Sequence, residues 1–318
     1  MRSATPVNSP FLLGTNIQYA WDSTSLGWLK ECPRKYQYSM IEGWRAKVES
    51  VNLKFGSLYH HALENYDKYV AEGDDHDIAL DKILDETLRA TWENDAPWTP
   101  DHNTKNRENL IRSIIWYVEH FKEDPAKTIQ LANGKPAVEL SFKMVMDYGP
   151  EHAAVTNRIF YQPYMLCGHL DRLVDFAGGA YVMDRKTTAS TISGQWFDQF
   201  APDNQMSLYS MAAQVIYKTP VQGVIIDGVQ IAVGFSRFAR GFTYRTPAQI
   251  EEWLVDTRRW LRLAEQYAQE GHWPQNDKAC HHYGGCVFRK VCSKSPEVRE
   301  KFLESDFHRV PWNPLVPR

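Results

Sequence analysis

Two short segments of this chain place acidic and basic side chains where they could act together. The first reads Gly-His-Leu-Asp-Arg and contains Asp171, and the second reads Val-Met-Asp-Arg-Lys-Thr and contains Asp184 and Lys186. Side chains alternate along a strand, so Asp184 and Lys186 project from the same face. An exposed hairpin with a surface ion pair would carry the same residues, whereas burying these charges requires pairing or a metal ion.

Gly178-Gly179 lies between the two segments and indicates a hairpin, which makes the two strands neighbours. Asp171 and Asp184 then converge, and two close carboxylates raise each other's pKa unless a cation neutralises them. Mg²⁺ or Mn²⁺ suits such a site because both prefer oxygen ligands. A metal held there would activate a water and stabilise charge on a scissile phosphate. Lys186 would position that water or stabilise the transition state.

Polar residues on two predicted helices could support this chemistry. His60 lies on the first, and Gln205 and Tyr209, four residues apart, share a face of the second. His60 could supply a nitrogen ligand to the metal, while Gln205 and Tyr209 could hydrogen-bond a phosphate or a metal-bound water. Each also has an ordinary interpretation, as a capping or core histidine or as part of an amphipathic helix.

The cysteines form a second pattern. Cys280, Cys286 and Cys292 are separated by five residues each, and Cys32 lies in Glu-Cys-Pro-Arg-Lys-Tyr near the start of the chain. In a reducing compartment such clustering favours a metal over disulfides. Four thiolates suit zinc or an iron–sulfur cluster, and their spacing does not decide between the two. The fifth, Cys167, is expected to be a buried apolar residue.

The elements that must position these residues follow from the hydrophobic periodicity. Helices are predicted at 24–40 with a bend at Pro33, at 56–72, 77–93, 105–123, at 204–217 with Asp203 as its cap, and from Pro247 onward. Strands are predicted at 137–147, 157–162, 166–176, 179–186, 222–233 and 236–245. This order predicts an α+β fold with a mostly antiparallel sheet and a helical insertion near the N-terminus.

In this order the motifs resemble a known family. Gly-x-x-x-His-x-x-Leu-Glu around His60, Gly-x-x-Asp-Arg, Asp-x-Lys-Thr-Thr and Gln-x-x-x-Tyr are similar to the RecB-type nuclease domain of the PD-(D/E)xK superfamily, over about residues 24–292. The resemblance implies a restriction-endonuclease-like core, a central mixed sheet flanked by helices. It also implies that His60, Asp171, Asp184 and the Arg185 carbonyl bind the metal, with Lys186, Gln205 and Tyr209 completing the catalytic centre.

The resemblance extends to domain organisation. We expect one nuclease domain over residues 1–318, with a helical insertion at 74–130, a catalytic core at 136–270 and a cysteine-bearing tail at 272–305 that closes onto the helix at Cys32.

One early and three late cysteines resemble the iron–sulfur subgroup of this family, which includes AddB-like recombination nucleases and CRISPR-adaptation nucleases. This implies a [4Fe–4S] cluster at Cys32, Cys280, Cys286 and Cys292. The subgroup often has two residues in the first late gap where this chain has five, so zinc, with His281 or His282, stays an alternative.

Together these features predict a Mg²⁺- or Mn²⁺-dependent DNA nuclease. We expect an exonuclease on single-stranded or end-bearing DNA in recombination or repair, of a phage or mobile-element type, with a recombination or helicase partner or as an oligomer. The alternatives are a CRISPR-adaptation nuclease and a catalytically silent DNA-binding subunit. A net charge of −3 is compatible with DNA binding through local basic clusters. The chain has no apolar run of about 18 residues, so we expect no membrane span and a cytoplasmic protein.

Overall fold

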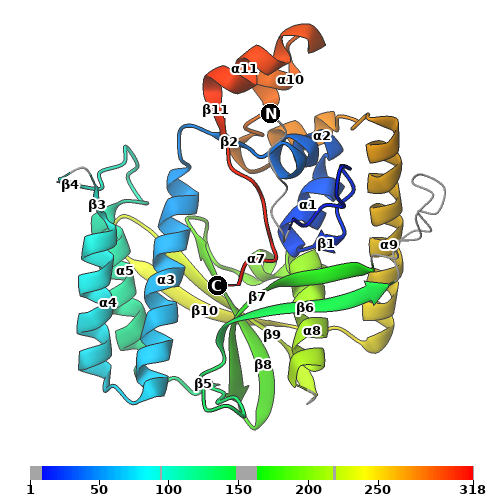
Figure 1. Ribbon diagram of the computed structural model, residues 1–318. Coiled ribbons are helices and arrows are strands. Elements are labelled where there is room, and N and C mark those ends of the chain that lie inside the picture. The colour runs from blue at the N-terminus through cyan, green and yellow to red at the C-terminus, as the bar shows by residue number, and fades with distance from the viewer. Residues whose placement is uncertain (1–8, 94, 148–162, 218–219, 318) are drawn as a thin grey trace. The chain divides into compact units, whose positions relative to one another are not determined.

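The computed structural model describes residues 9–93, 95–147, 163–217 and 220–317, which group into two compact units (Figure 1). The first, here named the sheet unit, contains residues 49–140 and 169–246. The second, the cysteine unit, contains residues up to Val48, Ser141–Gly168 and everything from Pro247 on. The strand expected at 157–162 lies outside the described residues.

The sheet unit is built around a mixed sheet whose strands lie in the order β5-β7-β8-β9-β10. These strands are β5 (Lys127–Thr128), β7 (Tyr164–Phe176), β8 (Gly179–Thr188), β9 (Val221–Ile231) and β10 (Ser236–Thr243). Strand β6 (Val138–Asp147) also pairs with β7, and both strands contribute residues to both units.

The pairing confirms a mixed sheet, in which antiparallel pairs predominate as predicted, and adds parallel pairs that the strand order did not predict. Strands β7 and β8 are antiparallel, as are β9 and β10, whereas β8 and β9 run parallel along nearly their whole length. The reason is the connection: helices α7 (Gly194–Asp198) and α8 (Asn204–Tyr217) carry the chain back to the end at which β8 began. A crossover of this kind produces a parallel pair, which a short turn cannot do.

The β7–β8 hairpin closes through a two-residue turn at Ala177-Gly178, one residue earlier than the glycine pair suggested. Both turn residues have positive φ, 51° for Ala177 and 79° for Gly178. Positive φ at both central residues gives the turn the twist that the flanking strands need. The resulting register pairs Phe176 with Gly179 and Arg172 with Met183.

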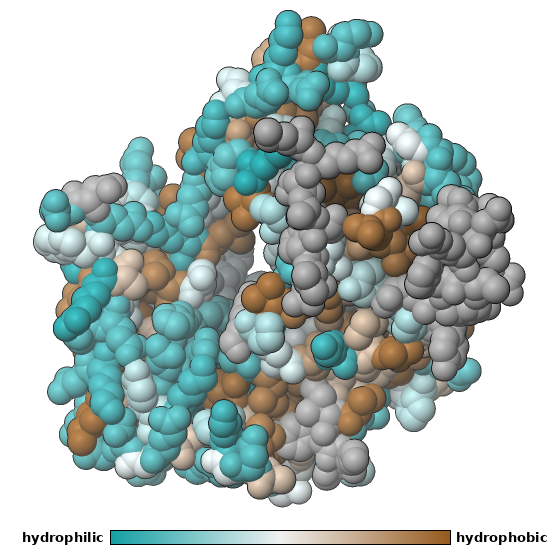
Figure 2. All heavy atoms as spheres, viewed as in Figure 1, coloured by the Kyte–Doolittle hydropathy of each residue, from teal (hydrophilic) through white to brown (hydrophobic). Residues whose placement is uncertain are grey.

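Helices cover both faces of this sheet (Figure 1). One face carries α3 (Val51–Glu72) and α5 (Arg107–His120), with α4 (His76–Ala90) packed against both. Val229 and Ile231 of β9 pack into the core formed with these helices. The neighbouring Gly228 faces the other side of the sheet, where it lies close to Trp196 of α7. The outer surface of α3 and α4 is mainly hydrophilic (Figure 2).

The predicted helices are present with shifted ends: α3 begins at Val51, before the expected residue 56, α4 ends at Ala90, before the expected residue 93, and α5 is shorter than the expected 105–123. Helix α3 ends at Gly73, whose φ of 112° lies in the left-handed region that favours glycine at a helix C-terminus. A short hairpin of β3 (Trp92–Glu93) and β4 (Ala96–Pro97) lies between α4 and α5.

The cysteine unit combines the start and the end of the chain. Its helical segments are α1 (Ser23–Glu31), α2 (Pro33–Tyr36), a π-helical turn at Gln37–Ile41, α9 (Pro247–Glu270), a 3₁₀ segment at Asp277–Gly284, α10 (Arg289–Cys292), a 3₁₀ turn at Pro296–Val298 and α11 (Arg299–Asp306). Its short strands are β1 (Ala20–Trp21), β2 (Trp44–Ala46) and β11 (Phe307–Arg309).

One feature of this unit was expected from the sequence, and a second was not. Cys32 leaves the helical conformation and Pro33 begins α2, which gives the bend expected at this proline. Strand β2 pairs antiparallel with β11 near the other end of the chain, and Trp44, Phe288 and Phe307 share one core.

None of the helices over the described ranges has the length and apolar character needed to cross a bilayer.

Candidate active site

Asp171 and Asp184 emerge side by side because of the β7–β8 register. Arg172 pairs with Met183, so the next residue outward on each strand is one of the two aspartates. Alternation then directs Lys186 to the same face of β8 as Asp184, and Arg185 to the opposite face. The structure therefore brings together the three residues with which the sequence analysis began.

Asp184 is the most deeply buried acid of this group. Its side chain is fully buried, and Lys186 Nζ lies 2.6 Å from its Oδ2. Neither carboxylate oxygen has a hydrogen-bond partner of good geometry among the described residues. Burial raises the pKa of Asp184 to about 6; Lys186 opposes the rise and the neighbouring charge of Asp171 adds to it. This carboxylate lacks the hydrogen bonds that buried polar atoms ordinarily have.

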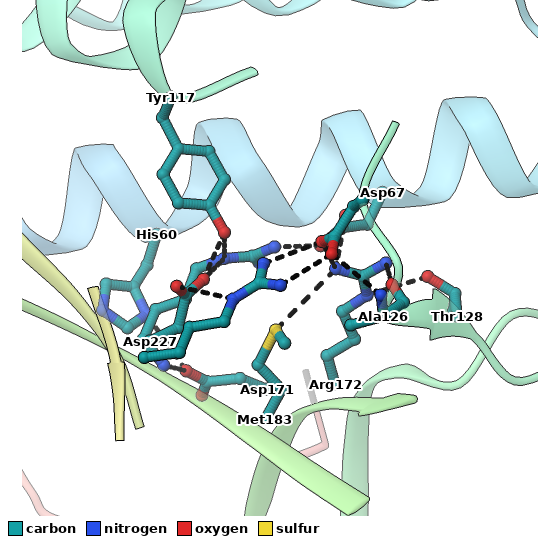
Figure 3. A network of polar contacts seen from close by, with 12 residues as sticks. His60, Asp67, Tyr117, Ala126, Thr128, Asp171, Arg172, Met183 and Asp227 are labelled. Atoms are coloured by element: carbon teal, nitrogen blue, oxygen red, sulfur yellow. Dashed lines mark hydrogen bonds and ion pairs between the residues drawn. The ribbon is translucent and has the colours of Figure 1, made fainter. Parts of the chain in front are cut away.

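Asp171 is bound from two sides. The backbone N–H of Arg185 donates to its Oδ2 over 3.0 Å, and His60 Nδ1 of α3 lies 3.4 Å from the same oxygen. Burial alone would raise the pKa of Asp171, but the hydrogen bond and charge of His60, with the charge of Lys186, hold it below its ordinary value. Asp171 is therefore held as an anion within β7, facing His60 (Figure 3).

Helix α8 contributes the third side of the site. Asp203 caps its first turn through a hydrogen bond from the Met206 N–H to Oδ1 over 2.9 Å, as predicted. Lys186 Nζ then donates to Gln205 Oε1 over 2.9 Å, and Gln205 Nε2 donates to the Tyr209 hydroxyl over 2.8 Å. The residues four apart on this helix thus form one chain of hydrogen bonds that ends on the catalytic lysine candidate.

The charges of the two aspartates also act on Lys186 and Tyr209. Burial would lower the pKa of Lys186, but Asp184 and Asp171 raise it above its ordinary value, so its ammonium group stays charged. Burial, with the same two carboxylates, raises the pKa of Tyr209 well above its ordinary value. At neutral pH the site therefore contains a cationic lysine and a neutral tyrosine.

The donor set of His60, Asp171 and Asp184, one nitrogen and two carboxylates, suits a hard divalent cation. Within the described ranges, however, no three His, Cys, Asp or Glu side chains are gathered tightly enough to hold a metal ion. Here Asp184 faces Lys186, while Asp171 faces His60 and the Arg185 amide. Asp184 Oδ1, which has no hydrogen-bond partner among the described residues, is the atom best suited to receive a cation.

A buried ionic network lies on the opposite face of β8 (Figure 3). Arg185 Nη2 lies 2.6 Å from Asp67 Oδ2 of α3, and its Nε lies 3.7 Å from Asp227 Oδ2 of β9. Arg172 Nη1 lies 3.4 Å from Asp67 Oδ1. Asp227 in turn accepts from Arg240 Nε over 3.2 Å. The network ties α3 to the four strands β7, β8, β9 and β10, directly behind the two candidate aspartates.

The sequence analysis missed the acids of this network. One signal was present: Asp227 is a single charged residue within the apolar run of β9, and a buried charge requires a partner. Nothing local identified that partner, because Tyr117, Arg185 and Arg240 come from three other elements.

In the cysteine unit, all four cysteines of the second pattern are free. The helix at Cys32 contacts the tail through Arg34 Nε, which donates to the Trp273 carbonyl over 2.7 Å, and through the Asn276 N–H, which lies 3.4 Å from Cys32 Sγ. Burial raises the pKa of Cys286, and the nearby Cys32 and Cys280 raise it further.

The pKa of the Cys292 thiol is raised as well. Burial raises its pKa to about 11, with contributions from Cys286 and Cys32. These four thiols therefore lie within electrostatic reach of one another, although less tightly than metal binding requires. Cys167 is separate and buried, as expected, with its Sγ directed at the Trp21 carbonyl.

Comparison with known proteins identifies the class of protein that this site belongs to. The model of the PD-(D/E)XK nuclease superfamily matches residues 23–293, so the chain belongs to that superfamily. It is therefore a nuclease, which hydrolyses phosphodiester bonds, and nucleases of this superfamily generally use divalent metals such as Mg²⁺ or Mn²⁺. No curated protein matches the chain.

Two solved structures are similar to this chain at low identity. One is a candidate exonuclease from Eubacterium rectale, with 11% identity, a TM-score of 0.49 and coverage of 89% of this chain and 92% of that one. The other is the protein SSO0001, with 13% identity, a TM-score of 0.35 and coverage of 87% of each chain. Likenesses this distant add nothing to the family assignment.

Proposed function

We propose that this protein is a Mg²⁺- or Mn²⁺-dependent deoxyribonuclease that acts on single-stranded DNA or DNA ends. The observation that carries the proposal is the fully buried Asp184, which forms an ion pair with Lys186 and lies beside a second carboxylate, Asp171. One lysine does not neutralise two neighbouring carboxylates, and a divalent cation would offset the remaining cost of burying their charge. We propose that it acts on DNA during recombination or repair. It would work in the cytoplasm with a helicase or a recombination protein as partner.

Each residue has a role that its contacts support. His60, Asp171, Asp184 and the Arg185 carbonyl would hold the metal, which when bound activates a water for attack on phosphorus. Lys186, kept protonated by the two aspartates, stabilises negative charge on the phosphate and does not act as a base. Gln205 fixes the direction of the Lys186 ammonium group, and Tyr209 supports Gln205.

The proposal is tested by cleavage of linear single-stranded, nicked and blunt-ended DNA with Mn²⁺. Asp184→Asn should lower kcat by at least about 10²-fold, the loss typical of removing one group that stabilises the transition state. Asp175→Asn, an exposed carboxylate on the neighbouring strand β7, is the matched control and should cleave like the wild type. Equal inactivity of wild type and Asp184→Asn on every substrate would favour the catalytically silent DNA-binding subunit instead.

Substrate topology separates exonuclease from endonuclease activity. An exonuclease degrades linear single strands from their ends and leaves circular single strands intact, and we expect this result. Cleavage of circular strands would identify an endonuclease. Activity confined to short duplexes with single-stranded overhangs would favour the CRISPR-adaptation alternative.

We also propose that Cys32, Cys280, Cys286 and Cys292 hold a [4Fe–4S] cluster with a structural role. Four free thiols on segments that contact each other supply the donor set for a cluster or for zinc. A brown, anaerobically purified protein with iron and sulfide in equal amounts is the expected result. A colourless protein with one zinc per chain would replace the cluster by zinc.

A further inference from the structure

Lys105 is a buried cation whose charge the surrounding residues do not neutralise. Its side chain comes from the loop before α5 and is only 4% exposed. Its Nζ lies 3.4 Å from Thr187 Oγ1 and 5.0 Å from the centre of the Phe55 ring. Among the described residues no carboxylate forms an ion pair with it, and burial lowers the pKa of its ammonium group.

The other buried cations of the sheet unit are treated differently. Arg172 and Arg185 both pair with Asp67, and Arg240 pairs with Asp124. The fold thus supplies an aspartate wherever a guanidinium is buried behind the active site. Lys105 has a neutral hydroxyl and an aromatic face instead, which leaves its charge available to a ligand.

Two neighbours fix the place of Lys105 relative to the catalytic centre. Thr187 directly follows Lys186 on β8, and its Oγ1 lies 3.7 Å from where a Cβ on Gly56 would be. Gly56 precedes His60 by four residues, which is about one turn, or ~5.4 Å, along α3. Thr187 projects from the face of β8 opposite to Lys186, towards α3. Lys105 therefore lies on the α3 side of β8, about one helical turn from His60.

We propose that Lys105 binds the phosphate next to the scissile one on the substrate strand. This inference rests on the proposed nuclease function and adds a second phosphate contact to it. A phosphate at this place would supply the anion that the fold withholds from Lys105, and an ammonium group binds phosphate as a point charge. A hydrogen bond holds the loop in place directly before Lys105: Asn109 Nδ2 donates to the Thr104 carbonyl over 2.7 Å.

The first test is DNA binding in an Asp184→Asn background, which needs no catalysis. Oligothymidylate affinity is measured at several salt concentrations with Lys105→Gln added, and with Lys82→Gln as the control, an exposed lysine of α4 paired with Asp74. Lys105→Gln should weaken binding about tenfold and reduce the salt slope by ~0.7, the value for one phosphate contact on a single strand. Lys82→Gln should change neither.

The second test uses a strand with one neutral methylphosphonate next to the cleaved linkage. If Lys105 binds that phosphate, the neutral linkage raises KM for the wild type but has no further effect on Lys105→Gln, while Lys105→Arg retains the wild-type response. An unchanged salt slope, or additive effects of the variant and the methylphosphonate, overturns the inference. A lower urea midpoint for Lys105→Gln with an unchanged salt slope would make Lys105 purely structural and also overturns it. These outcomes leave the proposed function standing, provided that the wild type cleaves DNA and Asp184→Asn does not.

Discussion

At the scale of single residues, the chemistry depends on how Lys186 and Asp184 share one face of β8. The ammonium group of Lys186 lies 2.6 Å from one Asp184 oxygen and donates to Gln205, so two partners fix its position. A metal that binds Asp184 would compete with Lys186 for that carboxylate and leave the lysine free to turn to the substrate phosphate. The same side chain can thus pair with Asp184 when no metal is bound and stabilise charge during the reaction.

Lys186→Met tests this role. It removes the positive charge and keeps the length of the side chain, so kcat should fall by about 10²- to 10³-fold. KM should change little, because the charge acts mainly in the transition state. Steady-state cleavage with Mn²⁺ measures both constants. A variant whose KM rises while kcat is retained would make Lys186 a substrate-binding residue only.

At the scale of elements, the site depends on how firmly β8 is held against α3. Arg185 contributes its backbone N–H to Asp171 on one side and its guanidinium to Asp67 on the other. The buried network therefore fixes the strand that carries the candidate catalytic residues Asp184 and Lys186. It acts by positioning and has no contact with the substrate in this account.

Asp67→Ala should break this connection. It leaves the buried guanidinium of Arg185 with a weaker set of partners, and breaking a buried pair in this way costs about 3–5 kcal/mol of unfolding free energy. Asp74→Ala, at an exposed pair with Lys82, should cost less than about 1 kcal/mol. Urea unfolding of both variants measures the difference. Equal midpoints would show that the network does not stabilise the fold.

Helix α9 carries a buried acid that gives a separate pH dependence. Burial raises the pKa of Glu265 to about 7 from an ordinary 4.5, and one of its oxygens has no hydrogen-bond partner among the described residues. Between these two values the folded state binds more protons than the unfolded state. This contribution to stability is therefore full below pH 4.5 and is lost as the pH rises towards 7.

Glu265→Gln should remove the loss of folding stability that the wild type shows as the pH rises towards 7. At pH 8 the variant should be more stable than the wild type by about 1–2 kcal/mol, a value that allows for partial solvent screening of the carboxyl. At pH 4.5 the two proteins should unfold at the same urea concentration. Glu270→Gln, an exposed site on the same helix, is the control and should have no effect. A wild type that gains stability between pH 5 and 7 would contradict the sign of the effect.

At the scale of the whole molecule, the sequence predicts what depends on local periodicity. Alternation along β8 and a turn near Gly178 were sufficient to bring Asp171, Asp184 and Lys186 together, and Asp203 marked the start of α8. The expected domain bounds and the metal ligands stay predictions.

What the sequence could not predict depends on contacts between distant segments. Asp67 reaches Arg185 across 118 residues, and no period in the chain marks that contact. Lys105, expected to begin the helix at 105–123, lies in the loop before α5 and reaches Thr187 across 82 residues. The parallel β8–β9 pair was missed because it depends on the path of the intervening helices.

The most direct test of the central claim is Mn²⁺ binding to the full-length protein, measured by calorimetry. The wild type should bind Mn²⁺ at the Asp184 site, and Asp184→Ala should weaken that binding by at least about tenfold, a loss seen even when a supporting group of a metal site is removed. Asp175→Ala should bind like the wild type. Equal Mn²⁺ affinity in the wild type and Asp184→Ala would contradict the assignment of this carboxylate as a metal ligand.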